Sequence, residues 1–259
     1  MHDLFRMDLY RMRKSRGFRV LLIVSFVLAF VMPLLRRGFI WLVEITGDDP
    51  TPIDMLFGAN PNLSWIIGNP FSSINALLMF LSAFVFFGAD TSRGYIKNTI
   101  GLVPGRDRTI LTRFFAIMVH NALFMVAGVA GCLFGTMIFK QIVFDGEIIK
   151  GILTFLTKYV LGLSLTALIM WLTLARKNKG LGIVTAVLTG SRMLMAVYML
   201  ISMGINLLVK TGNFELVKWI PDQLLYSEDP QQPYTILIAI GILGLFLWLS
   251  VRSFRKRDL

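Results

Sequence analysis

Charge, cysteine and histidine are scarce in this chain of 259 residues. Only 16% of the residues are charged and 56% are apolar, whereas about a quarter of a soluble domain is charged. The single cysteine, Cys132, can form no disulfide within the chain and is expected to pack as a small apolar residue. Of the two histidines, His120 lies in an apolar run and His2 lies near the terminus, so no metal site is expected.

Acidic side chains are absent from the middle of every long apolar run. Proton- and sodium-coupled carriers usually need such a carboxylate, and an enzyme acting on phospholipid headgroups would need clustered acids or a His/Asp/Ser set. The chain also has no G-x-x-x-x-G-K-[ST] motif, so it is not expected to bind ATP in the P-loop manner. We therefore expect no catalytic residue, metal or cofactor on this chain, and any energy source would belong to another chain.

Long apolar runs dominate what is present. A helix needs roughly 20 apolar residues to cross a bilayer core, and the runs show no alternation typical of barrel strands. The sequence predicts an all-α integral membrane protein with one transmembrane domain, residues 1–259. The six expected spans cover residues 18–35, 70–89, 114–139, 151–175, 181–209 and 234–251.

Several local features refine this prediction. Pro33 is expected to kink or end the first span, which would leave residues 39–43 as a short outer or interfacial helix. Segments 36–69 and 210–233 are expected to be extracellular. Gly131 and Gly135 form a small-xxx-small pair that favours close helix approach, although glycine is also simply common in membrane helices.

Basic residues are distributed unevenly along the chain, whose formal net charge is +11. Eighteen of the 26 Lys and Arg residues lie in the N-terminal segment, residues 89–113, residues 176–180 and the C-terminal tail. Ten of the 15 acidic residues lie in the other loops. Because Lys and Arg favour the cytoplasmic side, both termini are predicted to be cytoplasmic, and the positive charge needs no nucleic-acid partner.

Residues 1–17 are predicted to form an amphipathic helix lying in the membrane interface. Met1, Phe5, Leu9 and Met12 recur at helical spacing, and basic residues lie away from them. The alternative is an ordinary basic flank that only fixes the orientation of the first span.

Few polar residues are expected inside the spans. Arg192 falls near the middle of the fifth span, where a cation costs about 2.5–3.5 kcal/mol on insertion scales. It would either line a polar pathway or bond to neighbours such as Asn121. Lys158 is expected to snorkel outward, and His120 with Asn121 to form an interhelical hydrogen-bonding pair. Arg192, His120 and Asn121 are the candidate pathway residues.

Residues 90–113 form a basic, turn-rich segment between the second and third spans. It resembles the cytosolic coupling helix of the ABC-2 type permeases, which show an acidic residue, G-x-I-K-N and then a basic residue. The corresponding residues are Asp90, Gly94, Ile96, Lys97, Asn98 and Arg108. The chain ending Phe254, Lys256, Arg257, Asp258 and Leu259 and the expected six spans are also similar to that family.

The resemblance implies the permease subunit of a type V-like ABC exporter in the bacterial cytoplasmic membrane. Two ATPase subunits carrying ATP and Mg would dock on the coupling helix, and two permease chains, favoured as a homodimer, would form the pathway. The implied docking residues are Arg93, Gly94, Tyr95, Ile96, Lys97 and Asn98, with Phe5, Arg6 and Leu9 as additional candidates.

The substrate implied by the resemblance is an amphipathic or antimicrobial peptide or toxin, and a carbohydrate exporter remains possible. Segment 36–69 is longer than expected for minimal members of the family and could shape an outer gate. Two other classes stay open, namely a secondary carrier and a membrane sensor or scaffold that transports nothing.

Overall fold

The computed structural model describes residues 2–46, 62–70, 73–92, 106–140, 142–175, 178–209, 220, 224–225 and 233–255. Of these residues 90% are helical and none forms a strand, apart from an isolated bridge between Asn62 and Val143. The predicted all-α class is therefore confirmed for the described part of the chain.

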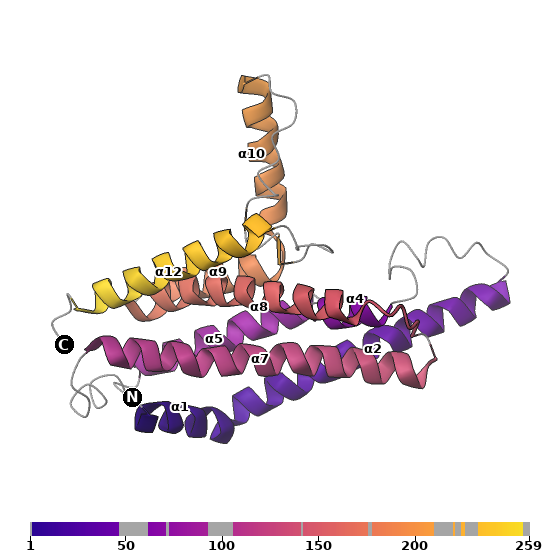
Figure 1. The fold of residues 1–259 in the computed structure, drawn as a ribbon, viewed down its shortest axis with the longest axis horizontal. Coiled ribbons are helices and arrows are strands. Elements are labelled where there is room, and N and C mark those ends of the chain that lie inside the picture. The colour runs from indigo at the N-terminus through magenta and orange to yellow at the C-terminus, as the bar shows by residue number, and fades with distance from the viewer. Residues whose placement is uncertain are drawn as a thin grey trace.

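Ten helical elements make up the described chain (Figure 1). They are α1 (His2–Lys14), α2 (Arg16–Thr46), α4 (Leu63–Gly68), α5 (Ser73–Ser92), α7 (Arg106–Ile138), α8 (Ile148–Met170), the π-helical η1 (Trp171–Ala175), α9 (Lys179–Gly190), α10 (Leu194–Val209) and α12 (Pro233–Arg255). Among the described residues, α2, α7, α8 with η1, and α12 are long and apolar enough to cross a membrane. Helices α5 and α9 contribute shorter apolar stretches.

The helices form an elongated bundle with two distinct ends (Figure 1). At one end α1 and α7 begin and α5 and α12 end. We call this the basic end because Arg6 of α1, Arg108 in the first turn of α7, and Arg252 and Arg255 in the last turn of α12 lie there. At the far end α2 ends and α8 begins. The first and last described helices therefore share one end of the bundle.

Among the described helices, α2 and α7 share the most extensive contact, and glycine makes their close approach possible. A Cβ added at Gly131 would lie 2.3 Å from the carbonyl oxygen of Phe26, and one at Gly135 would lie 2.8 Å from that of Phe30. The prediction that Gly131 and Gly135 admit a neighbouring helix is confirmed. Both contacts involve backbone atoms, so neither can be relieved by rotating a side chain.

Helix α2 is longer than expected, because it continues through Pro33 to Thr46. The prediction that the first span ends near residue 35, with a separate helix at 39–43, is therefore wrong. Proline removes one backbone hydrogen bond from the helix. The Pro33 ring, however, packs closely on Gly135 of α7, because a Cβ added at Gly135 would lie only 3.0 Å from the ring Cγ. Packing against α7 thus helps to retain the helix beyond the proline.

The predicted fifth span is broken into two helices. Helix α9 ends at Gly190, and α10 leaves the bundle at a steep angle (Figure 1). Arg192 lies in the turn between them with an exposed side chain and φ of 60°, the left-handed conformation that ends helices. Arg192 is therefore not in the middle of a continuous helix, which corrects the sequence-based placement.

Helix α1 packs against α7 at the basic end. Its buried residues are Leu4, Asp8 and Met12, whereas Phe5 and Leu9 are only half-buried. The apolar face predicted through Phe5 and Leu9 is thus rotated by about one residue. Asp8 is tolerated on the buried face because Arg11 lies 3.7 Å away on the same helix.

The core lies between α5, α7 and α8. One cluster packs Met79 and Phe80 of α5 against Phe124 and Met125 of α7 and Leu161 of α8. A second cluster, closer to the basic end, is formed by side chains of α5, α7, α8, η1 and α12. It includes Phe87, Ile110, Phe114, Met170 and Phe254. These two clusters fix the relative positions of α5, α7 and α8, which carry the buried Ser82, His120 and Thr166.

Candidate functional site

The sequence-predicted site residues fall into three groups. The coupling-helix residues, Arg93–Asn98, lie outside the described residues. On α1, Arg6 is exposed while Phe5 and Leu9 are half-buried. Of the pathway candidates, the structure brings His120 and Asn121 together in α7, but the exposed Arg192 lies in the turn after α9.

His120 and Asn121 belong to a buried row of four polar side chains, which we call the polar cluster: Ser82 of α5, His120 and Asn121 of α7, and Thr166 of α8. Ser82 Oγ lies 2.7 Å from His120 Nε2, and His120 Nδ1 lies 3.1 Å from Asn121 Oδ1. Asn121 Nδ2 donates to Thr166 Oγ1 over 2.8 Å. The cluster therefore joins three helices through side chains, and the predicted interhelical role of His120 and Asn121 is confirmed.

The hydrogen bonds assign a direction to the row. Thr166 donates its hydroxyl proton to the carbonyl of Gly162 at 2.8 Å and accepts from Asn121, so Asn121 Oδ1 faces the imidazole. A neutral His120 then donates from Nδ1 to Asn121, and its Nε2 accepts from Ser82. If the imidazole is protonated, both nitrogens donate, and Ser82 donates to the carbonyl of Met79 at 2.9 Å instead. The hydrogen bonds of the cluster can therefore be satisfied with a neutral or a protonated imidazole.

Aromatic rings enclose His120 on the side facing α2. The imidazole centroid lies 5.1 Å from the ring of Phe18 and 4.8 Å from that of Phe124. Between α1, α2 and α5 lies a cavity of about 410 Å³ whose lining includes Ser82 and His120 of the polar cluster. We call it the basic-end cavity, after the end of the bundle at which α1 begins.

A second polar region lies at the far end, where α4 packs on the start of α8. The backbone N–H of Leu63 donates to the carbonyl of Val143 at 2.9 Å. A Cβ at Gly151 would lie 2.6 Å from the carbonyl oxygen of Ser64, so the two segments touch through their backbones. Beyond α4, the carbonyl oxygen of Pro70 packs on Gly128 of α7, where an added Cβ would lie 2.6 Å from it. The segment 62–70 is thus inserted between α7 and α8.

Lys158 is buried at the inner end of this segment. Its side chain is 1% exposed, and Nζ donates a hydrogen bond to Asn69 Oδ1. Lys158 lies ten residues into α8, which is about 15 Å from the start of the helix. The expectation that Lys158 snorkels outward is therefore wrong, because segment 62–70 brings a polar acceptor inward to meet it.

A small pocket of about 280 Å³ opens between α4 and the start of α8. Its polar lining includes Asp145, Glu147 and Lys150 together with Ser64 and Asn69. The Ser64 hydroxyl donates to Asp145, and this hydrogen bond lowers the pKa of the Asp145 carboxyl from its usual value. The pocket therefore carries both acidic and basic side chains at the surface of the far end.

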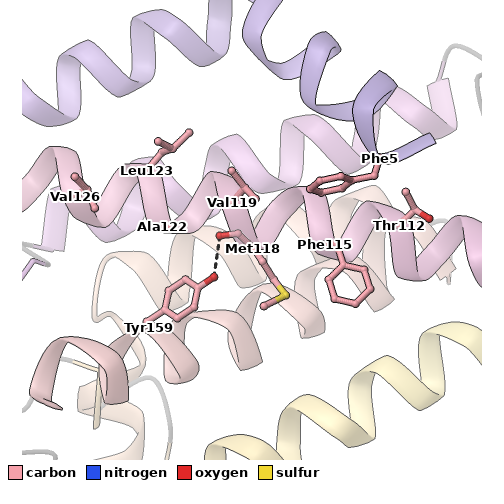
Figure 2. Close-up of a pocket in the computed structure, with 9 residues that line it drawn as sticks. All are labelled: Phe5, Thr112, Phe115, Met118, Val119, Ala122, Leu123, Val126 and Tyr159. Carbon is pink, nitrogen blue, oxygen red and sulfur yellow. Dashed lines mark hydrogen bonds between the residues drawn. The ribbon is translucent and has the colours of Figure 1, made fainter. Parts of the chain in front are cut away.

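A third cavity, an apolar groove of about 570 Å³, follows α7 near the basic end (Figure 2). Phe115, Val119 and Leu123 of α7 line it, and Phe5 reaches over it from α1. Its only phenol, on Tyr159, donates to the carbonyl of Met118 at 3.0 Å. The groove therefore presents almost purely apolar surface.

Ser82, Thr166 and Asn69 were not singled out from the sequence as functional residues. Serine and threonine are common in membrane helices, and Asn69 before Pro70 has the pattern of a helix N-terminus. Their partners are 38, 45 and 89 residues away along the chain, so no local spacing signals them. Within the described ranges, no group of three or more His, Cys, Asp or Glu residues could hold a metal ion.

Comparison with known proteins gives no independent assignment of the polar cluster or of the cavities. No family model matches the chain, and no curated protein or solved structure matches it significantly.

Proposed function

We propose that the chain is the membrane-spanning permease subunit of an ATP-driven transporter of the ABC-2 type. In this proposal the six spans are α2, α5, α7, α8 with η1, α9 with α10, and α12, and both termini are cytoplasmic. Two permease chains form the pathway, and a separate ATPase chain hydrolyses ATP. The proposed substrate is an exported amphipathic or antimicrobial peptide.

The geometry of the basic end is the observation that carries this proposal. Helix α5 ends at Ser92 and α7 begins at Arg106, so segment 93–105, with the motif that resembles a coupling helix, connects two helices at this end. Helix α1 packs against α7 there, and its Arg6 is exposed. A partner that docks on Lys97 could contact α1 as well. An ATPase bound at one end would act directly on α5 and α7.

Interior polarity supports a transport role. Polar side chains inside a membrane are costly and commonly mark pathways or moving parts. The polar cluster joins α5, α7 and α8, and Lys158 meets Asn69 where α4 ends before α5. Discontinuous helices of this kind are typical of transporters.

Co-purification with an ATPase encoded beside this chain tests the proposal. The double variant Ile96→Asp with Lys97→Glu should lose the ATPase while still inserting in the membrane, because it reverses charge and removes apolar contact in the docking segment. The matched control makes the same changes at the exposed Leu181 and Lys179 of α9. The proposal fails if no ATPase co-purifies, or if the first variant retains it as well as the control does.

Transport itself requires the reconstituted complex. Proteoliposomes containing the chain and its ATPase should move a fluorescent amphipathic cationic peptide only when ATP and Mg are supplied on the ATPase side. A hydrolysis-deficient ATPase is the control for passive leakage. ATP hydrolysis that no peptide stimulates and that moves no peptide would leave the permease role but exclude this substrate class.

A proton-coupled carrier is the second candidate, and the polar cluster is the observation that favours it. His120 can be neutral or protonated without leaving Ser82 or Asn121 unsatisfied. Such a carrier would move substrate in ATPase-free vesicles under a pH gradient, and His120→Gln would abolish this movement. ATP-dependent transport that survives collapse of the gradient contradicts the carrier and favours the ABC-type permease.

A further inference from the structure

The basic-end cavity has a cationic mouth and a polar base. Arg11 and Arg16 lie at its mouth, beside the joint at Ser15 between α1 and α2. Ser82 and His120 form its base. Its volume of about 410 Å³ is within the range of roughly 300–1,000 Å³ that is usual for ligand sites.

The two arginines differ in how firmly they are held. The Arg11 guanidinium lies 4.9 Å from the centroid of the Phe86 ring and 3.7 Å from Asp8, which fixes its position and offsets part of its charge. Arg16 is exposed at the first turn of α2 and can follow a ligand. Six basic residues lie between Arg6 and Arg19, against the two carboxylates Asp3 and Asp8. The mouth therefore complements an anion.

The cavity also continues onto apolar membrane-facing surface. Val85 of α5 lines it and is 59% exposed, and Leu21 of α2 lines it from the other side. Val20 and Val24 extend the exposed apolar surface of α2 away from the mouth. An anion bound at Arg16 would have an apolar track leading from it along the span. A small soluble anion would use the mouth but not this track.

We propose that the basic-end cavity binds the headgroup phosphate of an anionic phospholipid from the surrounding membrane. The phosphate contacts Arg16 and Arg11, and an acyl chain lies along the exposed apolar surface of α2 and α5. Arg16 opens the first span, where anionic headgroups lie if the basic end is cytoplasmic. The site is independent of any ATPase partner and would exist in the isolated chain.

Native mass spectrometry of the full chain in mild detergent tests this site with two lipids, phosphatidylglycerol and phosphatidylcholine. The wild-type chain should retain phosphatidylglycerol in preference. Arg16→Gln should reduce its retention about fivefold, which corresponds to the ~1 kcal/mol that a basic residue contributes near an anionic surface. The control Arg13→Gln removes the same charge from an exposed residue of α1 that does not line the cavity, and it should leave retention unchanged.

A steric variant separates the cavity from general surface charge. Val85→Trp should fill the cavity and reduce phosphatidylglycerol retention without altering charge, whereas Leu237→Trp, at a 70% exposed position of α12, should not. Three results overturn the proposal: equal effects of Arg13→Gln and Arg16→Gln, full retention in Val85→Trp, or displacement of the lipid by millimolar inorganic phosphate alone. The last result would assign a soluble phosphate to the site.

Discussion

Replacing Gly131 by alanine probes the contact that sets the distance between α2 and α7. The added Cβ would lie 2.3 Å from the Phe26 carbonyl oxygen, against a minimum of 3.0 Å for real Cβ contacts, so the helices must separate by about 0.7 Å. Overpacking of this kind typically costs about 1–3 kcal/mol. At Gly135 the nearest oxygen is 2.8 Å away, about 0.2 Å too close, so Gly135→Ala should cost less.

Gly241→Ala in α12 is the matched control, because a Cβ there meets nothing within 4 Å. Alanine favours a helix over glycine by up to about 1 kcal/mol, so the control should be neutral or slightly stabilising. Thermal unfolding of the purified variants in one detergent, followed by tryptophan fluorescence, should rank Gly131→Ala below Gly135→Ala and both below Gly241→Ala. A Gly131→Ala variant that melts with the control would refute the close α2–α7 contact.

Three further outcomes follow from the polar groups. Asn69→Leu should lower the melting temperature more than Lys158→Met. Asn69→Leu removes an acceptor from a buried cation, which costs about 1–3 kcal/mol, whereas Lys158→Met removes the cation itself. The reverse order of melting temperatures would contradict the burial of Lys158. Ser64→Ala should raise the pKa of Asp145 toward its usual value in a carboxyl NMR titration. Since the hydrogen bond lowers the folded-state pKa, the stabilisation that it provides is present at neutral pH and is lost as pH falls through that pKa. In the proposed complex, Ser82→Ala should leave ATP hydrolysis intact but reduce transport per ATP, and an unchanged ratio would exclude a coupling role for the polar cluster.

The predictions that succeeded depended on local sequence. Runs of apolar residues longer than a bilayer crossing predicted α7, α8 and α12 to within several residues, because hydrophobic length alone decides such helices. The spacing of Gly131 and Gly135 predicted a close helix contact, because two small residues one turn apart leave a groove on a helix. The structure identifies the partner as α2.

The predictions that failed depended on partners distant in the sequence. Lys158 is buried because Asn69, 89 residues earlier, reaches it, and α2 passes through Pro33 while packing on Gly135, about a hundred residues later. The break at Arg192 follows Gly190, whose Cβ position lies 2.5 Å from Leu77 Cα of α5. A span model built only from hydropathy contains no information on these contacts.

Helix α5 is the element on which these distant contacts converge. Its first residues follow the segment that holds Lys158, its Leu77 touches Gly190 beside the α9 break, and its Ser82 begins the polar cluster. It ends at Ser92, where the proposed docking segment starts. At 20 residues α5 is about 30 Å long. A rigid-body shift of α5 at the basic end would therefore also move its residues at the far end. Among these contacts, the hydrogen bond of Ser82 is made by a small side chain of α5, and Ser82→Ala removes the hydroxyl without adding volume. For that reason its loss should separate ATP hydrolysis from transport instead of unfolding the bundle.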